Sequence, residues 1–198
     1  MTSAIETTTH PYSSPLAHLE AEIAALTAKC RRLSLERDCT SFASEETTAR
    51  LSWLRMQEQA TREKVDARTQ ASIDAGVTFP LVTLRKTLDL SEVEMTTLLM
   101  ASLPAFGLDL GDVLAGLQIG MGWGGVSVNT VAAVCGLDLD GRVKLLATLG
   151  KNGRLVQAGL VKVEEVDDGE PDAVWCATLC LTQTGFNAIT GTLEVPND

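Results

Sequence analysis

The chain has 198 residues, of which 45% are hydrophobic and only 4% aromatic, and it carries a net charge of −10. Enough apolar side chains are present for a buried core, which excludes a globally disordered chain. The length suits one domain with an appendage, or two small domains. The longest apolar runs, such as Leu98 to Met100, are far too short to cross a bilayer.

The negative charge is concentrated in the C-terminal part. Residues 1–75 carry 9 basic and 11 acidic residues, whereas residues 76–198 carry 7 and 15. An acidic domain is repelled by phosphate backbones, so the composition argues against a nucleic acid as the partner.

The first 14 residues are rich in Thr and Ser and contain neither Lys nor Arg. They lack the basic start and the apolar block of a signal peptide, so we expect residues 1–14 to be a disordered leader. Five cysteines, an odd number, lie mostly in apolar helical or strand patterns, which favours reduced thiols and a cytoplasmic location. Cys176 and Cys180 alone are a weak metal signal, so we expect no metal and no cofactor.

An amphipathic helix is predicted over residues 16–36, with Ser14 as its cap and Pro15 in its first turn. A second helical pattern runs from Glu45 to Ile73, after a short polar connection. We expect an antiparallel helical hairpin over residues 15–75. The alternative is a coiled-coil contact with another chain, giving a homo-oligomer through the N-terminal helices. The self-association seam would then have heptad-type spacing and comprise Leu16, Leu19, Ile23, Leu26 and Leu33, with Cys30 in register.

Two further helices are predicted after Gly76, which ends the second helix. Pro80 opens a short helix, and Ser91 caps a very apolar one that Pro104 ends. A helix over residues 108–119 follows. The glycine-rich stretch 121–125 follows no predicted strand and matches no phosphate-loop pattern, so we expect a turn with a partly exposed Trp123.

The remaining pattern is helix, turn, helix and β-hairpin. One helix covers residues 130–135 and ends at Gly136, and the next runs from Asp138 or Asp140 to Leu149. Two β-prone runs, 155–163 and 173–181, flank an acidic Gly/Pro turn, and a last helix covers 182–189. This order predicts a winged-helix domain over residues 76–192, followed by a tail at 193–198. The fold class is α+β, mainly α, with a small β-hairpin wing.

DNA binding is the usual role of a helix-turn-helix pair, and five bases with no acids lie between residues 141 and 163. The second helix of the pair, however, has no Asn, Gln or Ser to contact base edges. The predicted wing is also strongly acidic. The bases can be explained by charge balance with neighbouring acids. The DNA contacts under this alternative would be Arg142, Lys144, Lys151, Arg154 and Lys162.

Short apolar motifs in this region resemble a known family. The run from Leu90 to Pro104, then residues 110–117, 127–132, 155–161 and 181–191, is similar to the winged-helix N-terminal domain of bacterial Cdc48-like AAA+ ATPases. Some of these ATPases accompany contractile injection systems. The resemblance covers roughly residues 77–192 and implies a partner such as an ATPase or an assembly component. The sequence departs from the family in having no Walker A or Walker B motif.

Catalysis is not expected. Both histidines lie within the first 18 residues, and the paired acids, such as Asp109 with Asp112, sit at helix starts or in turns. We therefore expect a non-catalytic protein–protein interaction domain, an adaptor or recruitment module, rather than an enzyme. The alternatives are a DNA-binding transcriptional regulator and a structural component of a phage-like particle. The expected partner surface comprises Trp123, Trp175, Glu164, Glu165, Asp167 and Asp168.

Overall fold

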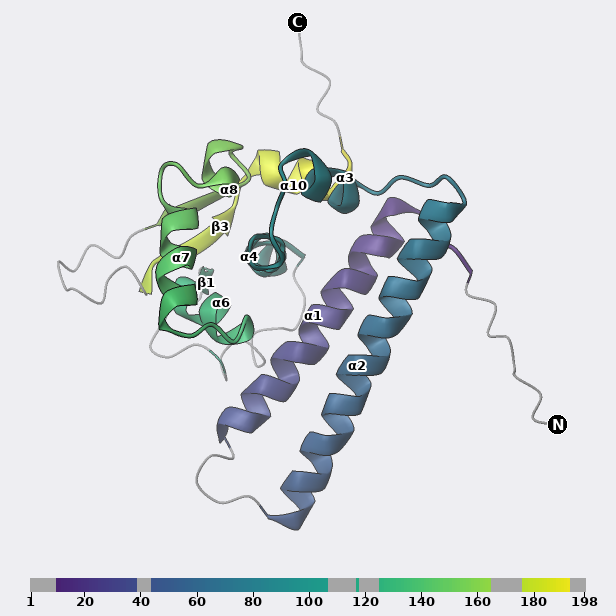
Figure 1. Cartoon of the computed structure of the whole chain (residues 1–198), viewed down its shortest axis with the longest axis vertical. Helices are drawn as coiled ribbons and strands as arrows, with labels where there is room; N and C mark the ends of the chain where they lie inside the picture. The colour runs from purple at the N-terminus through teal and green to yellow at the C-terminus, as the bar shows by residue number, and fades with distance from the viewer. Residues whose placement is uncertain (1–9, 39–43, 107–116, 118–124, 165–175, 193–198) are drawn as a thin grey trace, which may run out of the picture.

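The computed structural model of the chain describes residues 10–38, 44–106, 117, 125–164 and 176–192. Helices α1 (Pro15–Asp38) and α2 (Glu45–Asp74) form an antiparallel hairpin along one side of the molecule. Helix α1 lies between α2 and the remaining elements (Figure 1). The predicted hairpin is confirmed.

Local signals in the sequence set the ends of both helices. The Ser14 hydroxyl accepts a hydrogen bond from the Ala17 N–H at 3.1 Å, and Ser44 accepts one from Thr47 at 3.1 Å. Such caps satisfy N–H groups that have no partner inside a helix. Helix α2 ends before Gly76, whose φ of 79° is readily adopted only by glycine.

The apolar seam of α1 faces the rest of its own chain. Leu19, Ile23 and Leu26 belong to the same buried cluster as Leu98 and Leu155. Helix α1 contacts α4 (Glu92–Ser102), α6 (Val128–Val134) and α10 (Gln183–Thr190). The hairpin and the winged-helix region therefore share one core.

This burial contradicts the prediction that the same face of α1 is a self-association seam. Leu19, Ile23 and Leu26 are at most 8% exposed and are not accessible to a second chain, and Leu33 packs against the same core. Leu16 is 51% exposed and lies outside the core. The 3-4 spacing is typical of any helix that buries one face, so it did not distinguish a partner chain from the chain's own core.

Ion pairs join α1 to α2, whose own apolar stripe is sparse. Arg62 Nη1 lies 2.7 Å from Glu22 Oε2, and Arg55 Nη2 lies 2.7 Å from Glu36 Oε1. Arg32 pairs with both Glu36 and Glu58.

The predicted disordered leader is wrong for residues 10–14. Tyr12 is 5% exposed, its N–H donates to Ser72 Oγ at 2.9 Å, and its ring lies edge-on to Phe79 with centroids 5.8 Å apart. The guanidinium of Arg68 lies over the same ring, 4.0 Å from the centroid. A single buried aromatic residue gives no periodic signal, which is why the pattern did not reveal it. Residues 1–9 lie outside the described residues.

The next two helices form as predicted. Pro80 opens α3 (Pro80–Thr87), and Ser91 with Glu94 makes a capping box at the start of α4. Helix α4 buries Leu98 and Met100 fully. Pro104 lies in a 3-10 turn, η1 (Leu103–Phe106), directly after it. The predicted helix over 108–119 and the glycine-rich stretch 121–125 lie outside the described residues, except for the buried Leu117 and for Gly125.

The helix-turn-helix pair consists of α6, capped by Ser127, and α7 (Leu139–Leu149), capped by Asp138. Strands β1 (Val126–Ser127), β3 (Thr178–Leu181) and β2 (Val161–Glu164) form an antiparallel sheet in the order β1-β3-β2. The register pairs Val161 with Leu181 and Val126 with Leu179. Together with α4 these elements make a winged-helix fold of the α+β class, mainly α, as predicted.

Two parts of the β pattern differ from the prediction. Residues 154–157 form a helical turn, α8 (Arg154–Gln157), and the strand begins only at Val161. Strand β1 was not predicted, since two residues carry no periodicity. The last helix, α10, is confirmed and ends at Gly191 with a φ of 75°. No helix in the described ranges is long and apolar enough to span a membrane.

Candidate functional site

The outward face of α7 is apolar. Leu139 is 76% exposed and Val143 57% exposed, and the exposed Ala147 continues the same stripe one turn further. These positions follow i, i+4, i+8 spacing and lie on one side of the helix. Leu145 and Leu149 face the core. Helix α7 therefore carries apolar side chains both on its core side and on its outward side.

The five predicted DNA contacts are mostly engaged within the chain. Arg142 donates to Asn129 Oδ1 at 2.7 Å, and Lys144 Nζ lies 2.6 Å from Asp140 Oδ2. Lys162 pairs with Glu164. Lys151 is exposed in the turn after α7. Arg142, Lys144 and Lys162 therefore already have polar or acidic partners within the chain.

Arg154 joins two distant parts of the chain. Its Nε donates to Glu94 Oε1 at 3.2 Å, and its Nη1 donates to the Asp89 carbonyl oxygen and, at 3.2 Å, to Asp89 Oδ2. Glu94 is 1% exposed and needs donors for both carboxylate oxygens. Ser91 supplies them for one oxygen and Arg154 for the other. Arg154 thus ties α8 to the start of α4.

We expect Arg154→Met to lower the free energy of unfolding by about 1.5 kcal/mol, because it leaves one buried oxygen of Glu94 without a donor. The value is moderated by the 46% exposure of the Arg154 side chain. Urea unfolding at pH 7 measures it. Lys151→Met, in an exposed turn nearby, is the control and should change stability by less than about 0.5 kcal/mol. Equal effects of the two substitutions would contradict this role of Arg154.

The predicted partner surface is largely outside the described residues. Trp123, Trp175, Glu165, Asp167 and Asp168 fall there, and only Glu164 is described. Glu164 ends β2 and is exposed, beside Lys162.

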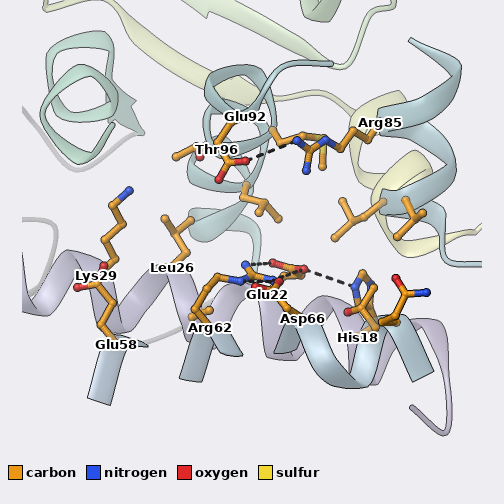
Figure 2. A pocket seen from close by; sticks show the side chains of 17 residues that line it. His18, Glu22, Leu26, Lys29, Glu58, Arg62, Asp66, Arg85, Glu92 and Thr96 are labelled. Carbon is orange, nitrogen blue, oxygen red and sulfur yellow. Dashed lines mark hydrogen bonds and ion pairs between the residues drawn. The ribbon is translucent and has the colours of Figure 1, made fainter. Parts of the chain in front are cut away.

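A cleft of about 650 Å³ lies between the hairpin and helices α3 and α4 (Figure 2). Its floor is apolar and includes Leu26, Leu81 and Leu99. Charged side chains line its walls: Arg62 and Asp66 come from α2, and Arg85, from α3, lies 3.5 Å from Glu92 of α4. The sequence pattern did not reveal this cleft, because its residues come from four helices.

Glu22 and Arg62 form a partly buried ion pair in this cleft. Arg62 donates to both oxygens of Glu22, at 2.7 and 3.1 Å, and to Asp66. Burial by itself raises the pKa of Glu22, but hydrogen bonds from His18 and Arg62 outweigh it and lower that pKa to about 2. The carboxylate therefore stays ionised throughout the physiological range.

His18 lies beside Glu22 in the cleft, and its side chain is 2% exposed. Its ring stacks on Phe79 with centroids 4.3 Å apart. Nε2 approaches Glu22 Oε1 at 3.5 Å, while Nδ1 and the nearby Thr69 hydroxyl have no hydrogen-bond partner in the described structure. Buried polar atoms are normally paired, so these buried groups are exceptions within the described structure.

The described residues contain no group of three or more His, Cys, Asp or Glu side chains that could hold a metal ion. Four of the cysteines are described, and all four are free thiols. Cys176 and Cys180, whose spacing gives only a weak metal signal in the sequence, are among them.

The exposed face of α7 could have been recognised from the sequence. Residues 139–149 are apolar around most of the helix, a pattern typical of two buried faces. The same composition also argues against base contacts, because it leaves few polar side chains on the helix. The positions that face outward, Leu139, Val143 and Ala147, depend on how α7 packs on the core.

Comparison with known proteins agrees with the fold. Residues 1–177 match the family described as "Winged helix domain, variant". No curated protein and no solved structure matches the chain. The family match includes the helical hairpin, the helix-turn-helix pair and the first wing strand. The chain therefore belongs to the variant winged-helix domain family.

Proposed function

We propose that this winged-helix protein is a non-catalytic protein-interaction module, and that the outward face of α7 is the surface that docks a protein. The observation that carries the proposal is the apolar stripe of Leu139, Val143 and Ala147 on the helix that other winged-helix proteins insert into DNA. Covering these exposed apolar side chains with an apolar surface of a partner protein removes them from water, which is favourable. The charged phosphates of DNA do not provide such an apolar surface.

Charge supports a protein partner over DNA. Residues 76–198 carry 15 acids and 7 bases, and the bases nearest to α7 already have partners in the chain. A DNA-binding helix needs positive charges that release counterions from phosphates. Pairing with Asp140 or Asn129 would have to be broken before Lys144 or Arg142 could serve.

A direct test uses fluorescence anisotropy of a labelled duplex at low salt, with the wild type and with the double charge reversal Arg142→Glu and Lys144→Glu. We expect no saturable binding below about 1 µM for either protein. Salt-sensitive submicromolar binding that is abolished by the charge reversal would establish the DNA-binding alternative instead.

The protein-binding surface is tested by affinity capture with quantitative mass spectrometry, comparing wild type with Val143→Asp. A charge in the middle of an apolar contact typically weakens binding by tenfold or more, so proteins retained through α7 should be lost. Met56→Asp is the matched control, because Met56 is also exposed, at 69%, but lies on α2. An identical set of retained proteins for wild type and Val143→Asp would overturn the proposal.

The resemblance to the N-terminal domains of Cdc48-like AAA+ ATPases suggests what kind of setting such a module would serve. In that setting the domain recruits a partner to an ATPase or to an assembly. Co-purification with an ATPase that is lost on Val143→Asp and kept on Met56→Asp would support this finer proposal. A structural role in a phage-like particle would instead require the chain to assemble with itself.

A further inference from the structure

The outer side of α2 carries a second exposed apolar stripe. Trp53 is 55% exposed and Met56 is 69% exposed, and the exposed Ala49 and Ala60 extend the stripe by one turn at each end. These positions follow a 4-3-4 spacing, which is typical of a helix that packs lengthwise against another helix. Val65, which is 3% exposed, lies on the opposite side of the helix from Met56, so the stripe is opposite the covered side of α2.

The described part of the chain leaves this stripe uncovered. Helix α2 forms one edge of the molecule, and α1 packs on its inner side (Figure 1). Trp side chains are highly buried on average, and Trp, Met and Arg are enriched where one protein contacts another. The described residues include five exposed large apolar side chains, of which two lie on α7 and two on the outer side of α2. The outer side of α2 is therefore a candidate interface that is separate from α7.

The stripe is complementary to itself when two copies of α2 lie antiparallel. A two-fold axis between Trp53 and Met56 places each Trp53 beside Met56 of the second copy, and each Ala49 beside Ala60 of the second copy. The thioether sulfur of a methionine contacts an aromatic ring favourably. The neighbours of the indole ring in this register include Ala49 and Ser52 of the second copy, whose small side chains leave room for the ring.

The charges at the ends of the stripe fit the same register. The antiparallel pair brings Arg50 of each copy beside Glu63 of the other copy. Both side chains are exposed, and no acid among the described residues lies within ion-pair distance of Arg50. Glu46 also approaches Glu63 in this register, but Arg50, one turn from Glu46 along the helix, offsets the charge of both acids. A parallel pair would set each of these acids against its own counterpart, which is unfavourable.

Net charge favours contact through this helix over contact through the rest of the chain. Helix α2 carries five basic and six acidic residues, whereas residues 76–198 carry 7 basic and 15 acidic residues. Two copies of charge −10 repel each other, and the repulsion decreases as their acidic parts move apart. Because α1 lies between α2 and the remaining elements (Figure 1), a contact through α2 keeps the acidic parts of the two copies apart.

From the spacing, the register and the charges we propose that the outer side of α2 binds the same surface of a second copy, which gives an antiparallel two-fold dimer. This surface differs from the apolar side of α1, which is buried in the chain's own core. The inference does not depend on the proposed function. Helices α7 and α2 lie on opposite sides of the molecule, so the dimer leaves α7 of both copies accessible (Figure 1).

The dimer is expected to be weak. The stripe from residue 49 to residue 60 is about 17 Å long at 1.5 Å per residue, so the interface is small. We expect a dissociation constant on the order of 10–100 µM.

Sedimentation equilibrium of the full chain at about 0.15 M salt measures the association. The average mass of the wild type should rise from 21.1 kDa towards that of a dimer as the concentration increases, and not beyond it. Met56→Asp places a charge in the centre of the stripe and should weaken the dimer about tenfold or more. Val143→Asp is the matched control, because Val143 is also exposed, at 57%, but lies on α7. It should dimerise like the wild type, and circular dichroism checks that every variant is folded.

Charge reversal tests the antiparallel register. Arg50→Glu alone and Glu63→Arg alone each set like charges against each other, so each should dimerise less than the wild type. An equimolar mixture of the two variants should restore the dimer, because both ends of the mixed pair then have an acid beside a base. A mixture that associates no better than either variant alone, a wild type that stays monomeric at every concentration, or a Met56→Asp variant that dimerises like the wild type would overturn the inference. The proposed function fails separately, when affinity capture shows no dependence on Val143.

Discussion

Gly153→Ala is expected to lower the free energy of unfolding by about 3 kcal/mol, at the upper end of the usual effect of overpacking a core. Gly153 is buried in the turn between α7 and α8. A methyl group there would overlap the backbone carbonyl of Thr148 and would lie 3.1 Å from the Gly150 oxygen. Backbone atoms cannot rotate away as a flexible side chain can, so α7 and α8 would have to separate.

The expected loss of stability comes from steric overlap and not from backbone strain. Gly153 has φ −70° and ψ 140°, which alanine adopts without strain. Gly150 in the same turn has φ −70° and ψ 174°, and a methyl group there would meet no atom closer than 3.4 Å. Gly150→Ala is therefore the control, with an expected change within about 0.5 kcal/mol. Urea unfolding of both variants measures the difference, and a tolerated Gly153→Ala would contradict the packing between α7 and α8.

Glu22→Gln is expected to cost about 2 kcal/mol at pH 7. The pKa of Glu22 falls from its usual 4.5 to about 2 in the folded chain, and each tenfold change in the ionisation equilibrium corresponds to about 1.4 kcal/mol. The free energy that this pKa shift implies is reduced, because the Arg62 side chain is 43% exposed and water screens its attraction to Glu22. The amide removes the charge that Arg62 pairs with and leaves the guanidinium partly buried.

The same substitution has a defined pH dependence. A depressed carboxyl pKa stabilises the fold fully above pH 4.5, and the stabilisation is lost as the pH falls towards 2. The difference in the free energy of unfolding between the wild type and Glu22→Gln, measured by urea titration, should therefore decrease from pH 7 to pH 3. Glu20→Gln, an exposed position on the same helix, should show no such gap. A gap that is constant with pH would show that the ionised carboxylate of Glu22 does not contribute.

The helices of this protein could be predicted well because their signals are local. Ser14 and Ser91 cap helices where the sequence predicts caps, and Gly76 follows the end of α2 as expected. Each of these signals depends only on residues within one turn. The order of the elements then sufficed to predict the winged-helix fold.

Features that depend on distant residues could not be predicted. Strand β1 exists because Val126 pairs with Leu179, more than fifty positions away. The seam of α1 could be assigned to a hairpin or to another chain, but its place against α4 and α10 required the tertiary structure. The same is true of the sites. The outward orientation of the Val143 side chain and the cleft that His18 lines both arise from packing between helices.

The burial of Leu19 and Ile23 in the winged-helix core has a consequence for inheritance. A gene fragment encoding only residues 76–198 would encode a core with one wall missing, because those two side chains come from the hairpin. Recombination at the end of the hairpin would therefore separate two segments that share one core. We expect related genes to encode the hairpin and the winged-helix region together.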